Sequence, residues 1–290
     1  MKKRILSAVA ALSLTASASF ACDIHGKGGF APENNLKISQ WDKASNSMTK
    51  ERFLAIVKSV SDIYEPIVKA KGGTLSMNNR WDDDTVNASA QQIGKKWVVN
   101  MYGGLARHQL TFDDGFALVV CHELGHHIGG APRKGMSWAA NEGQADYFGS
   151  MKCLRRVLEK QDNITAVSKM TIDAEATKQC EMIYKNADEV ALCQRVSMAG
   201  KSLGQLLGSL GGSSKINFDT PDKTTVTKTN DNHPAAQCRL DTYFSGILCD
   251  KSYDQDTDKN DPKIGTCIAR DGYKSGVRPL CWYKPATDEI

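Results

Sequence analysis

Apolar residues between positions 53 and 68 recur at three- and four-residue intervals, which is typical of one face of a helix. Ser47 or Thr49 is suited to cap the start of this helix, and Gly72 is suited to end it. Pro66 is expected to kink the last turn. The apolar face predicts that this helix packs against the core of the protein.

The stretch from residue 74 to residue 106 predicts strands, because β-branched and aromatic residues alternate there with polar ones. Segments 85–90 and 96–102 flank Gly94 and form the expected hairpin. Two roles are open for the second segment. It is either packed within the sheet, or it is an exposed edge that binds an extended peptide.

A strongly apolar helix is expected next, with Thr111 as its N-cap and Asp114 in its first turn. Gly129 and Gly130 are expected to end it. A second helix follows, for which Ser137 is the expected cap.

Two further helical segments, 165–185 and 187–210, precede a polar loop at 211–231. The remaining tail contains four cysteines and few periodic apolar residues. Together these elements predict an α+β fold that is mostly helical, with a small sheet next to the strongly apolar helix.

The N-terminus has the three parts of a secretory signal peptide. Lys2, Lys3 and Arg4 are followed by an apolar run from 5 to 14, and Ala21 marks a cleavage site. This run is too short for a stable membrane span, and no later segment has the length needed. The mature chain is therefore expected to have no transmembrane segment.

Loss of residues 1–21 would remove three basic residues and no acidic ones, so the net charge would fall from +4 to +1. A nearly neutral mature chain gives no electrostatic basis for nucleic-acid binding. The apparent basicity of the sequence thus belongs to the export signal.

Nine cysteines in an exported chain predict disulfide bonds, and the odd number leaves at least one cysteine over. Cys22 would be the first mature residue, where a lipid anchor is the alternative to simple secretion. Ser19 stands where lipoprotein signals carry leucine, which favours secretion. Cys121 is interpreted as a small buried apolar residue. The four cysteines of the tail allow three pairings, which the sequence leaves open.

The candidate chemistry begins with His122, Glu123 and His126. Two histidines four residues apart project from one face of a helix and can bind one metal ion, with the glutamate beside them. Glu142 is the best third ligand, which leaves one position for water, as in catalytic zinc sites. Asp146, one turn later, is expected to accept the second ring proton of His122. The predicted cofactor is Zn²⁺, and Glu123 is the predicted general base.

These residues resemble the HExxH and ExxAD motifs of gluzincin metallopeptidases, and in particular the soluble periplasmic branch of the HtpX/CAAX-prenyl-protease family. Residues 233–239 resemble the HPxxxxR motif of that family, and the resemblance covers roughly residues 80–240. It implies a zincin-like fold and nominates His233 or Arg239 as the donor to a developing oxyanion. His233 could instead fill the open zinc position at rest, and Arg239 could instead pair with a buried carboxylate.

The sequence therefore predicts an exported zinc endopeptidase, periplasmic or secreted, that cleaves proteins or peptides. Its expected parts are a signal peptide at 1–21, a zinc metallopeptidase domain at 22–240, and a cysteine-rich tail at 241–290 packed on that domain. The alternatives are an envelope binding or chaperone-like factor that keeps the zinc site with little turnover, and a purely structural zinc with four protein ligands. The acidic residues at 254, 256 and 258 lack the later ligands of a calcium loop.

Overall fold

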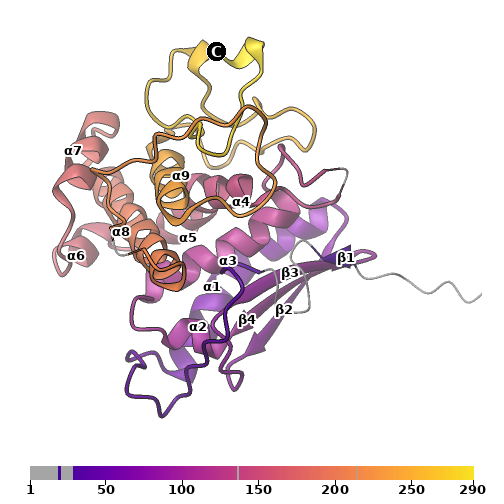
Figure 1. Ribbon diagram of the computed structural model, residues 1–290, viewed down its shortest axis with the longest axis vertical. Helices are drawn as coiled ribbons and strands as arrows, with labels where there is room; N and C mark the ends of the chain where they lie inside the picture. Colours follow the sequence, from indigo (N-terminus) through magenta and orange to yellow (C-terminus); the bar gives the residue numbers. More distant parts are fainter. Residues whose placement is uncertain (1–18, 21–28, 136, 214) are drawn as a thin grey trace, which may run out of the picture.

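The computed structural model describes residues 19–20, 29–135, 137–213 and 215–290 (Figure 1). The predicted cleavage site after Ala21 and the candidate anchor Cys22 lie outside the described residues. Among the helices of the described part, none is long and apolar enough to cross a membrane.

A small sheet lies on one side of the helices, in the strand order β1-β3-β4-β2 (Figure 1). The expected hairpin is confirmed: β3 and β4 are antiparallel, and Gly94 in their turn has a φ of +57°. Strand β2 pairs with β4 in parallel. The bounds are β1 Ser19–Phe20, β2 Thr74–Arg80, β3 Ala88–Ile93 and β4 Lys96–Tyr102.

Strand β4 has hydrogen-bonded neighbours on both sides, so it cannot bind a peptide by edge pairing. The edge role considered for residues 96–102 is therefore wrong, and the packed role is correct. The outer edge of β3 instead pairs with the two residues of β1.

The remaining elements are helical, and the longest three lie where the sequence predicts helices. Two predicted starts are wrong. Phe112, not Thr111, precedes α3, and Asn141, not Ser137, caps α4 by accepting from the Gln144 amide. The bounds are α1 Lys50–Ala70, α2 Gly103–Arg107, α3 Asp113–Ile128, α4 Glu142–Phe148, the π-helical turn η1 Gly149–Leu154, α5 Arg155–Leu158, α6 Asn163–Val167, α7 Ala174–Ile183, α8 Ala187–Leu210 and α9 Ala236–Leu248.

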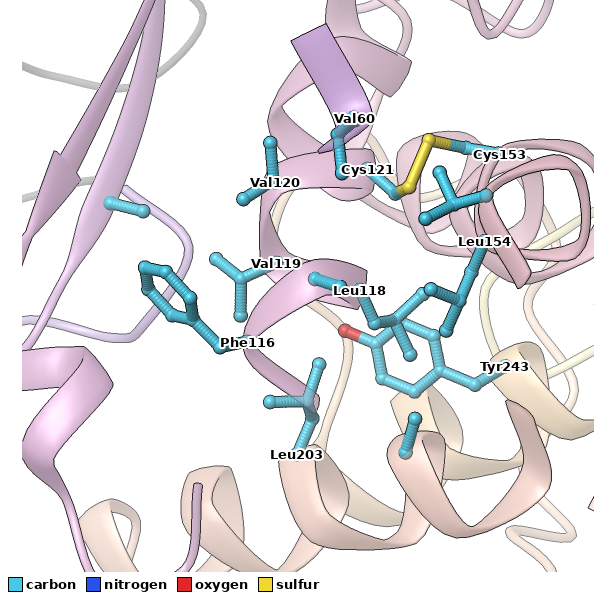
Figure 2. Packing of buried hydrophobic residues seen from close by; sticks show 14 of the residues in the cluster. Val60, Phe116, Leu118, Val119, Val120, Cys121, Cys153, Leu154, Leu203 and Tyr243 are labelled. Carbon is cyan, nitrogen blue, oxygen red and sulfur yellow. A yellow bond between two sulfur atoms is a disulfide. The ribbon is translucent and has the colours of Figure 1, made fainter. Parts of the chain in front are cut away.

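Helix α3 is buried on almost every side and forms the centre of the main core (Figure 2). Its apolar side chains face α1, α8 and α9 at once, which accounts for the continuous apolar run in its sequence. Figure 2 shows this packing for Val60, Phe116, Leu118, Val119, Val120, Leu203 and Tyr243.

Cys121 on α3 forms a disulfide with Cys153 on η1, with Cα atoms 5.5 Å apart (Figure 2). The burial expected for Cys121 is confirmed, but the residue is buried as half of a disulfide rather than as a lone apolar side chain. Residue 153 is 32 positions away, and only the contact between α3 and η1 brings the two thiols into bonding distance.

The other disulfides fasten the second half of the chain. Cys180–Cys193 joins α7 to α8, Cys238–Cys281 joins α9 to the tail, and Cys249–Cys267 lies within the tail. The predicted boundary at residue 240 falls inside α9, so the irregular tail begins at Cys249.

The acidic residues considered for calcium are used differently. Asp254 pairs with Arg156, and Asp256 pairs with Lys71. Asp258 accepts from the amides of its own turn. Each of the three carboxylates therefore has a partner within the protein.

Lys152 on η1 is a cation inside the fold, with 2% of its surface exposed. Its Nζ donates to the Ser252 carbonyl at 2.6 Å. Burial, together with the neighbouring Arg155 charge, lowers the pKa of Lys152 to about 7.

We expect this burial to make stability depend on pH in a defined direction. Between the folded pKa near 7 and the ordinary value of 10.5, the unfolded chain binds more protons than the folded one. The free energy of unfolding therefore rises with pH across this window, by at most about 1.4 kcal/mol per pH unit.

Lys152→Met should remove this pH-dependent contribution. The free energy of unfolding of the variant should therefore exceed that of wild type most near neutral pH and least at high pH. Urea unfolding at about pH 7 and about pH 9 measures the difference. Lys160→Met, at an exposed position, is the matched control. A constant difference between Lys152→Met and wild type at both pH values would contradict the prediction.

Candidate metal centre

Three side chains from two helices converge on one point inside the protein. His122 and His126 lie one turn apart on α3, and Glu142 is the first residue of α4. Glu142 Oε2 lies 3.4 Å from His122 Nε2 and 3.7 Å from His126 Nε2. Ligands about 2.0–2.1 Å from a tetrahedral ion lie about 3.3–3.4 Å from one another. The spacing therefore fits a common metal ion, and these three residues can hold one.

The two helices approach closely because Gly125 has no side chain. A Cβ at this position would lie 2.9 Å from the Ala145 carbonyl oxygen and 3.0 Å from the Ala145 Cα. Such contacts are too short for any larger residue. The backbone of α4 thus lies directly on α3, between the two histidine ligands.

The other ring nitrogen of each histidine is fixed by a hydrogen bond. His122 Nδ1 lies 2.7 Å from Asp146 Oδ1, and His126 Nδ1 lies 2.9 Å from the Ala140 carbonyl. A carbonyl oxygen only accepts, so His126 carries its proton on Nδ1 and offers the Nε2 lone pair to a metal. Burial lowers the pKa of His126 to about 4, which keeps this imidazole neutral.

Arg239 on α9 holds Asp146 in place from the opposite side. Its Nε donates to Oδ2 at 2.7 Å and its Nη2 donates to Oδ1 at 2.8 Å. Its Nη1 donates to the Phe30 carbonyl at 2.5 Å. The buried guanidinium is therefore engaged with a carboxylate and a carbonyl, which matches the pairing alternative rather than the oxyanion-donor alternative.

The charge on Asp146 follows from these partners. Burial by itself would raise the pKa of this carboxyl, but the Arg239 guanidinium and His122 outweigh it and hold the pKa at about 2. Asp146 is thus an anion at neutral pH and an acceptor for His122 Nδ1–H.

Glu123 lies beside the cluster and is also completely buried. Among the described residues, neither oxygen of its carboxyl group has a hydrogen-bond partner. Burial, together with the negative charge of Glu142, raises the pKa of Glu123 to about 8. A buried carboxyl group left this way indicates that another polar group belongs next to it.

His233, in the loop before α9, is more exposed than the metal-binding residues, with 27% of its side-chain surface accessible. Its Nε2 lies 3.3 Å from Glu142 Oε2 and 2.6 Å from the Gly29 carbonyl oxygen. Because the carbonyl accepts, this Nε2 carries a proton and donates. A donating Nε2 cannot bind a metal at the same time, so the arrangement fits the donor alternative for His233.

Sequence reasoning missed the segment at residues 29–31. The Phe30 ring meets His122 edge-on at 5.2 Å, and Arg239 lies over the same ring at 4.6 Å. The Phe30 amide donates to the Ala88 carbonyl at the start of β3. The polar, glycine-rich sequence around it gives no local signal for such contacts.

His127, next to the ligand His126, points away from the cluster. Its ring stacks between Trp97 and Trp138, with centroid distances of 5.4 Å and 4.6 Å. The packed position expected for this residue from helix geometry is the one observed.

Metal binding should stabilise the folded chain. At a free Zn²⁺ concentration about 1,000 times the dissociation constant, the free energy of unfolding should rise by about 4 kcal/mol. Thermal unfolding with zinc and after chelation measures the shift. His126→Ala should remove it, and an equal melting temperature for wild type with and without zinc would contradict the site.

Asp146→Asn should weaken metal binding without touching a ligand. Loss of the carboxylate leaves Arg239 as a buried charge without its partner, which costs about 3–5 kcal/mol of stability. Zinc affinity should fall about 10- to 100-fold because His122 loses its orienting acceptor. Competition with a chromophoric chelator, on protein shown to be folded, measures the affinity. Wild-type affinity in this variant would contradict the role of Asp146.

Comparisons with known proteins find no match to this chain among protein-family models, curated proteins or solved structures.

Proposed function

We propose that this protein is an exported zinc endopeptidase of the gluzincin type, as its motifs suggest. One observation carries the proposal. The donor atoms of His122, His126 and Glu142 converge on one point, and the buried Glu123 carboxyl group beside them has no hydrogen-bond partner among the described residues. A zinc site with a purely structural role needs no general base, so it would not offset the cost of burying a carboxyl group without a hydrogen-bond partner.

The residues divide the chemistry of peptide hydrolysis among them. A zinc ion, when bound, supplies a Lewis acid and an acidified water. Glu123 is placed beside the three candidate ligands, where it can take a proton and return it to the leaving amine. His233 already donates to a main-chain carbonyl, the kind of group that becomes the oxyanion. Asp146 and Arg239 orient His122.

An extended substrate would find its place at the outer edge of β3. Ser19 and Phe20 already pair there with Gln92 and Gln91 in antiparallel register. These two residues precede the predicted cleavage site, so export would free this edge for another strand. Main-chain pairing at this edge would give affinity for many sequences, as expected of an endopeptidase.

The disulfides support the proposed location. All eight cysteines in the described part of the chain are paired, across four bonds. Such bonds persist in the periplasm and outside the cell, where glutathione does not reduce them. A periplasmic or secreted location therefore follows as part of the proposal.

The alternative is a binding or chaperone-like factor with little turnover. The burial of the centre favours it, since His122, Glu123, His126 and Glu142 are each at most 1% exposed. For the enzyme, the residues covering the centre, which include Phe30, must move before a polypeptide can enter.

Glu123→Gln distinguishes the two. The variant should keep zinc affinity close to wild type and lose hydrolysis of an unfolded protein substrate by at least about 1,000-fold, because only the proton acceptor is lost. Glu65→Gln, on the exposed side of α1, is the matched control. Equal rates for wild type and Glu123→Gln in every protease assay would contradict the enzyme and leave the binding factor.

A further inference from the structure

The irregular tail after Cys249 lies over the junction of the two metal-binding helices, beside α4 and α9 (Figure 1). Arg278 is its most deeply engaged cation, with 4% of its surface exposed. Its Nε donates to Gln144 Oε1 at 2.8 Å. Its Nη2 donates to the carbonyls of Pro262 at 2.8 Å and Ala131 at 3.3 Å. The guanidinium therefore joins the tail to both sides of the junction.

Gln144 connects Arg278 to the C-terminal end of α3 by a second hydrogen bond. It is completely buried in the first turn of α4, two residues after the ligand Glu142. Its Nε2 donates to the Gly129 carbonyl at 2.6 Å, three residues after the ligand His126. The hydrogen bonds from Arg278 through Gln144 to Gly129 thus link one ligand helix to the other.

The rest of the guanidinium surface is held by aromatic rings. Arg278 lies over Tyr147 at 5.1 Å and over Tyr283 at 4.9 Å. The two rings allow only one orientation of the planar Arg278 guanidinium. A lysine ammonium group could not make the same set of hydrogen bonds and ring contacts.

Other tail residues brace the same junction. Trp282 is completely buried against Gly143, where a Cβ would lie 2.2 Å from the indole ring. The Asp258 carbonyl accepts from the Ala131 amide at 2.8 Å, and the Thr257 hydroxyl donates to the Ile128 carbonyl at 3.0 Å. Several independent contacts therefore hold the tail where Arg278 can act.

We infer that Arg278 is a positioning residue for the metal centre, which acts through Gln144 to set the spacing between His126 and Glu142. Without it, Gln144 Oε1 loses the donor that orients the amide group toward the Gly129 carbonyl, and the two ligand helices can shift relative to each other. Metal affinity is sensitive to such shifts because ligand distances must hold within about 0.2 Å. The inference rests on the metal centre of the proposed function but not on hydrolysis.

The test is metal binding by full-length Arg278→Met, with Arg270→Met at an exposed tail position as the matched control. Arg278→Met should bind zinc about tenfold more weakly in competition with a chromophoric chelator. Its Co²⁺ complex should show a changed visible absorption spectrum, which reports ligand geometry. Arg270→Met should match wild type in both measurements.

Two further variants separate positioning from general stability. Arg278→Lys keeps the charge but lacks the fork, so it should show the same spectral change as Arg278→Met. Gln144→Met should weaken zinc binding by a similar factor, and the double variant should be no weaker than either single one, since both act through one contact.

A folded Arg278→Met protein with wild-type zinc affinity and cobalt spectrum would overturn the inference, even if its melting temperature were lower. Additive losses in the double variant would also overturn it. A folded wild-type chain that binds no zinc would overturn both the inference and the metal centre. A chain that binds zinc but cleaves no peptide would contradict only the proposed endopeptidase activity. The inference about Arg278 would stand, because its tests measure metal binding and not hydrolysis.

Discussion

The ion pair between Asp146 and Arg239 is the interaction on which the centre depends. Both side chains are at most 1% exposed, and removal of each charge from water costs several kcal/mol. The bidentate geometry offsets this cost and leaves Asp146 Oδ1 to orient His122. The same guanidinium reaches the Phe30 carbonyl, so α4, α9 and the N-terminal segment meet at one charge. None of these elements can shift without breaking a buried contact of the others.

The ligand helix α3 is fastened on both sides of its histidines. Cys121, directly before His122, is tied to η1 by a disulfide. After His126, the Gly129 carbonyl accepts from Gln144. Between them, Gly125 lets α4 lie against the helix. The ligands are therefore presented by a rigid frame, which lowers the entropy lost when a metal binds.

The spacing of residues along the sequence predicts which side chains share one face of a helix, because helix geometry alone determines this. His122, His126, Glu142 and Asp146 follow from four-residue repeats, and the structure brings all four together. The partner of Cys121 did not follow, since pairing depends on how distant helices pack. The cap of α4 was misplaced because several polar residues precede that helix, and the Asn141 side chain is the one that reaches the Gln144 amide.

Long-range contacts set the rest of the centre. Arg239 is 93 residues from Asp146, and its sequence motif leaves two roles open, of which the observed contacts match the pairing with a buried carboxylate. Phe30 and the Ala140 carbonyl carry no chemical signature in the sequence, yet each contacts a histidine of the candidate metal cluster. The sheet order shows the same dependence, because β4 is interior only by virtue of its pairing with β3 on one side and with β2 on the other.

The place of the tail in the chain has a consequence for the order of assembly. Arg278 and Trp282 follow every ligand in sequence, and Cys281, beside Trp282, pairs back to Cys238 on α9. The three residues that can hold a metal ion therefore leave the ribosome before the residues that pack over them. The contacts from Arg278 through Gln144 to Gly129 can form only after the tail has folded back onto α3 and α4. The Cys238–Cys281 bond, which fastens this part of the tail to α9, belongs to the same late stage.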